Sequence, residues 1–513
     1  MSMNGAESLV HTLLASGIDT CFANPGTSEM HFVAALDRIA GMRCVLGLFE
    51  GVVTGAADGY ARMAGKPAAT LLHCGPGLAN GLANLHNGRR AHTMMVNCVG
   101  DQATYHRPLD APLTADTEGF ARGVSGWVRT ASHAGTVGQD AAVAAQAAMT
   151  MPGTIATLIL PSDTCWDDGG VVAAPLPVPV AQAAEPGAVS HVARILRRGE
   201  KVAIVLGNSA LRAAPLALAH AIAKATGAAI MAQTSNARIE RGAGRHAIDR
   251  IPYPVDQAVA YMAGVKHVIL VGAKKPVGFF AYPNKPGHMY PADAEVHVLA
   301  RMEHDLPATL QALAAELGAA PVAPVSGSRG EAARGAVTSD GLGASLSALL
   351  PEGAIVSDES VSFGRGLYPG THHAAPHDWI QLTGGAIGEG MPLATGAAVA
   401  CPDRRVVTLQ ADGSAMYTVQ ALWTQARERL DVTTVILANR KYAILLGELA
   451  GVGANPGRVA LDMMDLGNPD LDWVKIAGGM GVEAAKATTM EEFNDLFVAA
   501  NKRKGPFVIE LVI

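Results

Sequence analysis

Short apolar runs rich in valine, isoleucine and leucine recur along the chain, and each is followed by a longer segment with helical spacing of apolar residues. This alternation is typical of parallel sheets whose strands are joined by crossover helices. In the first third of the chain it predicts strands at 20–23, 44–49, 68–74, 94–99 and 154–160. It predicts helices in the gaps between them, for example at 50–63 and 78–90. The predicted fold class is therefore α/β.

Two segments break the alternation. Residues 169–187 are rich in proline, valine and alanine, and residues 320–341 consist of small residues and turn formers without apolar periodicity. Both compositions are typical of linkers. Beyond the first linker, further strands are predicted at 202–206, 267–271, 406–410, 433–437 and 507–513. We therefore predict three doubly wound parallel-sheet domains, at residues 1–168, 188–319 and 342–513.

Composition narrows the class of protein. With 513 residues, 49% apolar residues, 16% charged residues and a net charge of −6, the chain has no basic face, so no nucleic-acid partner is expected. The six cysteines are scattered and form no CxxC pair, which predicts a reducing compartment and no zinc site. The chain begins with an amphipathic helical pattern rather than a signal peptide, and prolines divide its longest uncharged segment. We therefore expect a cytoplasmic protein without a membrane span.

The strongest candidate site lies at the ends of two successive predicted strands. Asp412, Gly413 and Ser414 directly follow one strand, and Asn439 follows the next. Ligands of open parallel sheets bind at the carboxyl ends of strands, and carboxylate and amide oxygens suit Mg²⁺. Gly413 and Ser414 would open a helix whose N–H groups face a diphosphate. Each residue alone is more simply a helix cap or a strand end, but together they predict a magnesium-diphosphate site.

The segment 411–445, ADGSAMYTVQALWTQARERLDVTTVILANRKYAIL, resembles a known cofactor-binding motif. The motif belongs to the thiamine-diphosphate-dependent enzymes similar to acetolactate synthase large subunits and benzoylformate decarboxylase. The resemblance implies that Asp412 and Asn439 bind Mg²⁺ and that the backbone carbonyl of Lys441 is the third protein ligand. The sequence departs from the family at Ala411, where glycine is usual, and the extra methyl group is expected to crowd the turn.

Glu50 is the candidate for the acid that activates the cofactor. Thiamine diphosphate becomes reactive when a carboxylic acid hydrogen-bonds its pyrimidine ring, so that the ring's amino group can remove the thiazolium proton. Glu50 lies where an apolar predicted strand meets a helix rich in small residues, so it is expected to be buried. The alternative is that it only places a negative charge at the start of a helix, which is common at protein surfaces.

Three runs in the first domain resemble, in order and spacing, the pyrimidine-binding domain of the same family. They are residues 22–37, 49–62 and 71–87. The resemblance places His73 where benzoylformate decarboxylase has an active-site histidine. It places Thr27 where that enzyme has a serine that contacts the substrate carboxylate. Without the resemblance, His73 would be a structural histidine at a strand end and Thr27 a helix N-cap.

Two loops in the last domain resemble loops of the family that contact the cofactor. In the run QLTGGAIGEGMP, Ile387 would be the wedge that holds the cofactor bent, and Gly385 would offer its carbonyl to the 4′-amine. In the run SDESVSFG, Ser360 and Ser362 would donate hydrogen bonds to the diphosphate. Helix capping explains the two serines nearly as well.

The middle domain departs from the family where the substrate would be recognised. In the segment 277–290, Phe280 or Ala281 stands at the position of a second active-site histidine of benzoylformate decarboxylase. His288 is close but displaced, and His106 in the first domain is another candidate acid. The lysine and arginine features with which acetolactate synthases bind FAD are not evident, so FAD is not expected.

Three hypotheses for the function remain. The first is a thiamine-diphosphate-dependent lyase or ligase that decarboxylates a 2-oxo acid, possibly with ligation to a second carbonyl as in acetolactate synthase. The second is another lyase with the same cofactor, acting on an aldehyde or an acyl-CoA. The third is a non-catalytic binding or regulatory paralogue, which Ala411 and the unmatched middle domain favour. Retention of Glu50 argues against the third.

The resemblance also implies an oligomer. In the family, the pyrimidine domain of one subunit faces the diphosphate domain of another. Glu50 and Asp412 would therefore meet only across a dimer interface. We expect a homodimer or homotetramer with its active sites at that interface.

Overall fold

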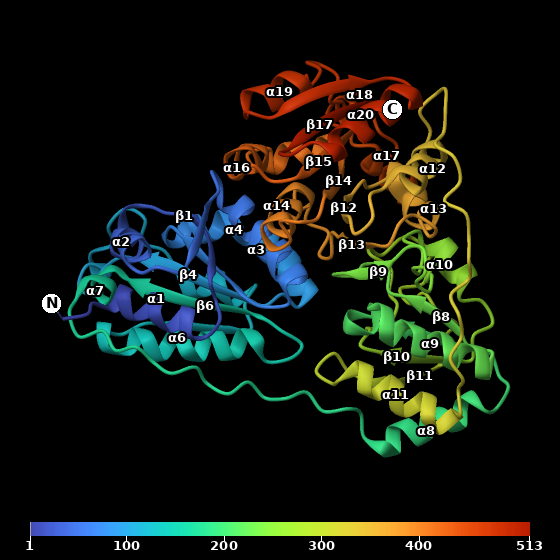
Figure 1. Cartoon of the computed structure of the whole chain (residues 1–513), viewed down its shortest axis with the longest axis horizontal. Helices are drawn as coiled ribbons and strands as arrows, with labels where there is room; N and C mark the ends of the chain where they lie inside the picture. The colour runs from blue at the N-terminus through green and yellow to red at the C-terminus, as the bar shows by residue number, and fades with distance from the viewer. Residues whose placement is uncertain (1) are drawn as a thin grey trace.

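The computed structural model describes residues 2–513 and consists of three α/β units, each built on its own sheet (Figure 1). The N-terminal unit lies at the left of the view, the middle unit at the lower right and the C-terminal unit at the top. Within the three sheets, every strand pairing is parallel except that of one short edge strand. The predicted α/β class with three parallel sheets is confirmed.

The N-terminal sheet has six strands in the order β2-β1-β3-β4-β6-β5. Its strands are β1 (Thr20–Asn24), β2 (Arg43–Leu46), β3 (Ala68–Leu72), β4 (Met95–Asp101), β5 (Trp127–Thr130) and β6 (Ile155–Pro161). Its helices are α1 (Gly5–Ala15), α2 (Met30–Arg38), α3 (Glu50–Ala64), α4 (Cys74–Ala91), α5 (Thr117–Arg122), α6 (Ala134–Met149) and α7 (Ser162–Trp166). The central strands β3, β4 and β6 are buried at every position, as strands covered by helices on both faces must be.

The middle sheet has four parallel strands in the order β11-β10-β7-β8. Its strands are β7 (Val202–Leu206), β8 (Ala229–Ala232), β10 (His267–Val271) and β11 (Glu295–Ala300). Its helices are α8 (Pro186–Leu196), α9 (Ala213–Thr226), α10 (Val255–Tyr261) and α11 (Leu306–Leu317). The strands β7 and β10 have the predicted bounds, because β7 is an uninterrupted apolar run, β10 is apolar after its first residue His267, and both are buried at every position.

The C-terminal sheet has seven strands in the order β16-β17-β15-β14-β12-β13-β9. Its strands are β9 (Ile239–Arg241), β12 (Ile355–Glu359), β13 (His377–Gln381), β14 (Val406–Ala411), β15 (Val432–Ala438), β16 (Glu483–Ala487) and β17 (Phe507–Val512). Its helices are α12 (Ser339–Leu349), α13 (Leu367–Gly370), α14 (Gly390–Ala400), α15 (Asp412–Ala415), α16 (Ala421–Glu428), α17 (Ala443–Gly451), α18 (Arg458–Asp462), α19 (Trp473–Gly479) and α20 (Met490–Lys502). The antiparallel edge strand β9 comes from the segment between the two linkers, so that segment contributes to two sheets.

Two helices from different units, α3 and α14, pack closely along their lengths. Glycines permit this approach: a Cβ atom at Gly59 would lie 2.0 Å from the Leu393 carbonyl oxygen, and one at Gly396 would lie 1.7 Å from the Ala56 carbonyl oxygen. Both distances are far below van der Waals contact, so any larger residue would force the helices apart. The small residues that follow Glu50 therefore join the N-terminal unit to the C-terminal unit.

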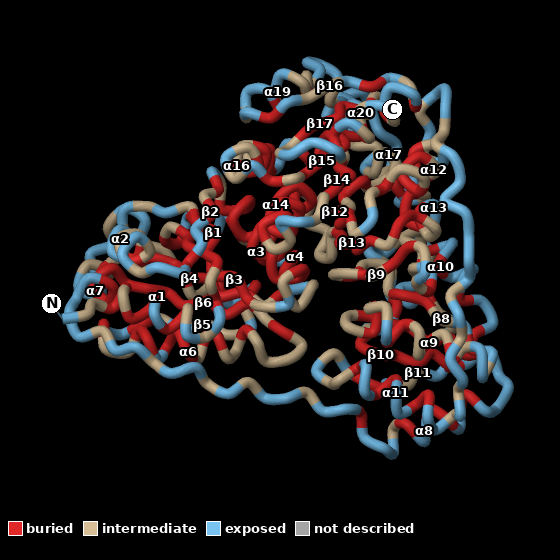
Figure 2. The backbone as a smooth tube through the Cα atoms, in the orientation of Figure 1, coloured by how far each residue is buried: buried red, intermediate tan, exposed pale blue. Residues whose placement is uncertain are grey.

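The two predicted linkers contain long stretches without helix or strand, at 171–185 and 319–335. Figure 1 shows the first crossing from the N-terminal unit to α8, and the second returning from α11 to α12. Both are largely exposed (Figure 2). The domain boundaries themselves stay predictions. No helix within residues 2–513 combines the length and apolar character needed to cross a membrane.

Two predicted elements have different bounds in the structure. The strand predicted at 44–49 ends at Leu46, because the chain turns at Gly47, where the Val53 side chain occupies the space a Cβ atom would need. The helix predicted at 78–90 begins at Cys74. The helix includes Pro76, because a proline in the first helical turn loses no hydrogen bond.

Candidate active site

Asp412 and Asn439 stand at the carboxyl ends of the paired strands β14 and β15, where Ala411 is opposite Leu437. The Asp412 side chain is buried, and its two oxygens accept hydrogen bonds from the Gly413 N–H at 2.8 Å and the Arg440 N–H at 2.6 Å. Burial raises the pKa of the Asp412 carboxyl, and these backbone donors oppose part of the rise. The structure thus brings the two predicted metal ligands to one edge of the sheet.

The turn after β15 presents oxygen atoms beside Asp412. The Asn439 Oδ1 accepts a hydrogen bond from the Lys441 N–H at 3.0 Å, and Arg440 has a left-handed conformation with φ 56°. Lys441 pairs with Asp465 in an isolated bridge whose hydrogen bonds are made by the Tyr442 N–H and the Arg440 carbonyl. The Lys441 carbonyl is therefore outside that bridge, as a metal ligand would have to be.

The structure adds detail to two expectations about the Asp412 turn. Ala411 has φ −70° and ψ 143°, an ordinary extended conformation, so its methyl group causes no backbone strain. The helix that Gly413 and Ser414 open, α15, has only one turn. It offers N–H groups to a diphosphate but only a small part of a helix dipole. The Ser414 hydroxyl also accepts a hydrogen bond from the Gln410 amide at 2.7 Å.

The loop 381–392 between β13 and α14 is held by side chains from the N-terminal unit. Asn87 donates to the Ala386 carbonyl at 2.7 Å and accepts from the Ala386 N–H at 3.2 Å. The Gly388 carbonyl accepts hydrogen bonds from Asn84 at 3.3 Å and Thr418 at 2.9 Å. This bracing fixes the backbone on both sides of the predicted wedge residue Ile387.

Glu359 also holds the loop 381–392, and the sequence pattern did not predict this role. Its carboxylate accepts hydrogen bonds from the N–H groups of Gly388 and Gly390, both at 2.6 Å, and from the Gln410 amide at 3.0 Å. Burial raises the pKa of Glu359, and these three donors oppose part of the rise. Its position in the run that contains Ser360 and Ser362 gave no signal, because all its partners lie elsewhere in the chain.

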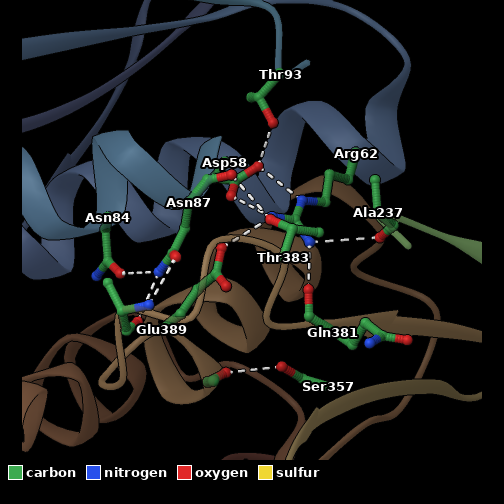
Figure 3. Close-up of polar contacts among 12 residues, drawn as sticks. Asp58, Arg62, Asn84, Asn87, Thr93, Ala237, Ser357, Gln381, Thr383 and Glu389 are labelled. Atoms are coloured by element: carbon green, nitrogen blue, oxygen red, sulfur yellow. Dashed lines mark hydrogen bonds and ion pairs between the residues drawn. The ribbon is translucent and has the colours of Figure 1, made fainter. Parts of the chain in front are cut away.

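A buried ion network ties all three units to this loop (Figure 3). The Arg62 guanidinium forms ion pairs with Asp58 at 2.5 Å and Glu389 at 2.8 Å, and it donates to the Gln381 carbonyl at 2.8 Å and the Ala237 carbonyl at 3.4 Å. Burial raises the pKa of Glu389 well above its ordinary value, against the opposing charge of Arg62. The network connects the C-terminal end of α3 to the predicted cofactor loop.

Glu50 begins α3 and is buried, as expected. Its carboxylate accepts a hydrogen bond from Asn80 at 3.0 Å. It also lies beside Gly77, where a Cβ atom would be 3.0 Å from the Glu50 Oε1 and 3.2 Å from the His73 Cβ. Glu50 and His73 are therefore near neighbours. Within residues 2–513, no hydrogen bond or ion pair joins the Glu50 side chain to Asp412.

His73 pairs with an acid that the sequence analysis missed. Its Nδ1 lies 2.9 Å from the Glu29 carboxylate and 3.3 Å from the Ser28 hydroxyl. Glu29 is buried, and the absence of a side chain at Gly100 leaves room for its carboxylate. Because a carboxylate only accepts hydrogen bonds, Glu29 fixes a proton on the His73 Nδ1. The other ring nitrogen, Nε2, is then the one available for proton transfer.

Thr27, His73 and His106 line one cavity of about 320 Å³. The cavity walls also include Tyr105 and Trp166. The three candidate residues come from three different connections that follow strands of the N-terminal sheet. The structure thus brings together His73, Thr27 and the alternative acid His106, which are far apart in sequence.

The serines of the loop after β12 differ in their surroundings. Ser360 is buried and donates a hydrogen bond to Asp358 at 2.5 Å, so its hydroxyl hydrogen is already used. Ser362 is half-buried. Val361 between them has φ 49°, a left-handed conformation that is costly for a β-branched residue. Strain of this kind is concentrated at functional sites.

The middle-unit segment 277–290 reaches the cofactor loop through a phenylalanine. A Cβ atom at Gly385 would lie 2.3 Å from the Phe279 ring, and Gly385 has φ 83°, so glycine is required there. His288 instead pairs with Val277 within the segment. A second cavity, of about 420 Å³, lies between this segment, the end of α4 and the carboxyl ends of the middle strands.

The expectation that FAD is not a cofactor stays a prediction.

Comparison with known proteins gives the family. The model for the thiamine pyrophosphate enzyme N-terminal TPP binding domain matches residues 3–121, and that for the C-terminal TPP binding domain matches residues 366–511. The chain is 54% identical, over 100% of its length and 99% of the relative, to the "Putative acetolactate synthase large subunit IlvX" of Mycobacterium tuberculosis. It therefore belongs to the thiamine pyrophosphate enzyme family, and its cofactor is thiamine diphosphate.

Two further relatives are named as decarboxylases. The benzoylformate decarboxylase of Pseudomonas aeruginosa is 29% identical, with 96% of each chain covered. The solved structure of a thiamine diphosphate-dependent 4-hydroxybenzoylformate decarboxylase from Rhodococcus jostii has a TM-score of 0.86 at 24% identity, covering 99% of this chain and 98% of that one. This structural likeness confirms the fold along the whole chain.

The residues of the loop 381–392 fit the cofactor. Ala386 and Gly388 are hydrogen-bonded through both their N–H and their carbonyl groups. In contrast, the Gly385 carbonyl and the Ile387 N–H have no hydrogen-bond partner within residues 2–513. These two groups flank Ala386, whose own N–H and carbonyl are both hydrogen-bonded to Asn87, so they are available to bind a polar ring edge.

Proposed function

We propose that this chain is an Mg²⁺-requiring enzyme of its family that cleaves the bond between the carboxyl and carbonyl carbons of a 2-oxo acid. The observation that carries the proposal is the buried Glu50 carboxylate beside His73, in a chain with two thiamine-diphosphate-binding domains. Two of the relatives are named for decarboxylation of benzoylformate or its 4-hydroxy derivative, both of which are 2-oxo acids. Bound thiamine diphosphate would supply an electron sink for the carbon that loses CO₂.

We assign the metal to the turns that follow β14 and β15. Asp412 would bind Mg²⁺ through a carboxylate oxygen, Asn439 through Oδ1 and Lys441 through its backbone carbonyl. Their placement on paired strand ends and the position of the Lys441 carbonyl outside the local bridge support this assignment. Gly413 and Ser414, together with Ser362, would donate to the diphosphate. Ser360 would position the loop through Asp358.

The N-terminal unit would supply the proton transfers. Glu50 would hold a proton at the pyrimidine nitrogen, and its burial keeps water from competing for it. His73, whose Nδ1–H would be held by Glu29, would deliver a proton to the reacting carbon from Nε2 when the ring is doubly protonated, and would be left with its proton on Nδ1. Thr27 lies on the wall of the same cavity, and its hydroxyl would donate a hydrogen bond to the substrate carboxylate. Protonation by His73 releases an aldehyde, whereas access of a second carbonyl compound to the cavity gives ligation.

We propose that the active form is a homodimer or homotetramer in which Glu50 of one copy acts beside Asp412 of another. Large apolar side chains are exposed beside both halves of the site: Tyr105 (68%) at the cavity of His73, and Tyr417 (52%) after the Asp412 turn. Exposed apolar groups that flank a site are typical of surfaces covered by a partner. An active monomer in analytical ultracentrifugation would contradict this assembly.

We also propose a cytoplasmic location. All six cysteines are free thiols, and four of them are buried, which is usual in a reducing compartment. Recovery of the native protein in a membrane or secreted fraction would contradict it.

A substrate panel tests the proposed reaction. Purified protein with thiamine diphosphate and Mg²⁺ should release CO₂ from at least one member of a panel of aromatic and aliphatic 2-oxo acids. Removal of divalent ions by chelation should abolish the release, and Mg²⁺ should restore it. Product analysis separates an aldehyde from a ligated hydroxyketone. If no 2-oxo acid is turned over but an aldehyde or acyl-CoA is, the proposal is wrong and the second hypothesis replaces it.

A further inference from the structure

A cluster of histidine and glutamate side chains lies in the middle unit, away from the proposed active site. His267 is the first residue of β10, and Glu295 and His297 lie on the adjacent strand β11. Residues two apart on a strand point to the same face, so Glu295 and His297 face the same way. All three are at the amino-terminal edge of the middle sheet. The 420 Å³ cavity lies at the opposite, carboxyl edge.

The three ligand-type atoms of this cluster are already placed for a metal ion. The His267 Nδ1 lies 3.1 Å from the His297 Nε2, and the Glu295 Oε2 lies 3.7 Å from the first and 3.6 Å from the second. A zinc ion bonded tetrahedrally at about 2.0–2.1 Å holds two imidazole nitrogens about 3.3–3.4 Å apart. The cluster therefore matches one face of a tetrahedron to within a few tenths of an ångström.

A second carboxylate sets the orientation of His267. The His267 Nε2 lies 2.9 Å from the Glu200 carboxylate. A carboxylate only accepts hydrogen bonds, so Nε2 must carry the proton and Nδ1 presents its lone pair to the cluster. Metal-binding histidines characteristically have such an outer carboxylate, because it fixes the tautomer and the ring orientation. The His267 side chain is 5% exposed and the Glu295 side chain 68%, so the site is buried on the side of His267 and open to solvent on the side of Glu295.

A further histidine lies next to the cluster. His191, on α8, has its ring centroid 5.4 Å from that of His297. The helix α8 lies at the lower end of the middle unit (Figure 1) and contacts β11. A rotation of the His191 side chain, or a water molecule, would complete a four-coordinate site.

We propose that His267, His297 and Glu295 bind one divalent transition-metal ion of the zinc class, with Glu200 as the orienting residue. Two imidazoles and a carboxylate suit Zn²⁺ or Co²⁺, whereas the oxygen ligands at Asp412 and Asn439 suit Mg²⁺. The scattered cysteines predicted no zinc site, but this cluster contains no cysteine. The ion would tie the starts of β10 and β11 together and stabilise the middle unit.

Cobalt provides the direct test, because tetrahedral Co²⁺ has intense visible absorption bands. Full-length protein, treated with a chelator and then loaded with thiamine diphosphate and Mg²⁺, should bind one Co²⁺ per chain with such bands, and Zn²⁺ should displace it. Glu295→Gln and His297→Gln should each weaken binding by about 100-fold or more, and Glu200→Gln by about 10–100-fold. Zn²⁺ should raise the unfolding temperature of the parent protein but not that of Glu295→Gln.

Two controls make the result decisive. His220, in the same unit, stacks on His246 and lies far along the chain from the cluster, so His220→Gln should leave Co²⁺ binding unchanged. Glu29, His73 and Cys74 also lie close enough to hold a metal, and Cys74→Ser reports on that group. The proposal is overturned if the parent binds neither Co²⁺ nor Zn²⁺. It is also overturned if binding is lost in Cys74→Ser but kept in Glu295→Gln and His297→Gln, in which case the middle cluster is only hydrogen-bonded.

Discussion

In the N-terminal half of the candidate site, the proposed proton-transfer groups are side chains at the starts of helices: Glu50 begins α3, and His73 immediately precedes α4. In the C-terminal half, the candidate ligands of the cofactor are mostly backbone groups and short polar side chains on loops after strands. The N-terminal groups have partners that set a proton position, Asn80 and Glu29. The C-terminal groups are braced so that their geometry is fixed. The roles proposed for the two halves are therefore proton transfer and cofactor binding, and variants should separate the two properties.

The largest expected effect is on turnover and comes from the N-terminal half. Glu50→Gln keeps the shape of the side chain but removes the acid, so kcat should fall by about 10²–10⁴-fold. The affinity for thiamine diphosphate, measured by calorimetry, should stay within the same order of magnitude. Asn80→Ala removes only the neighbouring donor and should cause a smaller loss of kcat. Equal losses of binding and turnover in Glu50→Gln would break the distinction between the halves.

The next effect is on stability and comes from the network that joins the halves. At a pH at which both carboxyl groups are ionised, Arg62→Met leaves the Asp58 and Glu389 carboxylates buried without their cation, which should cost about 3–5 kcal/mol of unfolding free energy. Urea unfolding monitored by circular dichroism measures this loss. Adding Glu389→Gln to Arg62→Met should recover part of it, because one of the unpaired charges is removed. A double variant less stable than Arg62→Met alone would show that the network does not act through charge.

A smaller effect is expected from the C-terminal half, on binding alone. Asp412→Asn removes the negative charge of a candidate metal ligand, so the Mg²⁺-dependent affinity for thiamine diphosphate should fall by about 100-fold. At saturating cofactor and Mg²⁺, kcat should largely recover. A kcat that stays low under saturation would place Asp412 in the chemistry and not only in binding.

The smallest effect is a change in pH dependence. Burial raises the pKa of Glu389 above its ordinary value of 4.5, so the folded chain keeps a proton that the unfolded chain releases. Its contribution to stability is complete below that ordinary value and is lost as the pH rises through the folded pKa. Glu389→Gln cannot titrate and should show a shallower loss of stability above pH 4.5, measured as urea midpoints across a pH series. The exposed Glu352→Gln should match the parent protein.

The spacing of apolar residues along the chain was sufficient to predict the fold class and to place candidate residues at the ends of strands. Apolar runs such as Val202–Leu206 are unambiguous, and strand ends in a parallel sheet converge on one edge, which brought Asp412 and Asn439 together. Glu29, Glu359 and Arg62 were missed for a common reason. Their partners are remote: Arg62 and Glu389 are 327 positions apart. Periodicity reports which face of an element is buried but not which distant residue a buried charge meets.

The Arg62 network has a consequence for protein engineering. It contains Asp58 from the N-terminal unit, the Ala237 carbonyl from the middle unit and Glu389 from the C-terminal unit, all around one guanidinium. A fragment that carries only the C-terminal unit would lack the cation that Glu389 needs. Chimeras that exchange units between relatives must therefore transfer Asp58, Arg62 and Glu389 as one set, together with the glycines that let α3 and α14 meet.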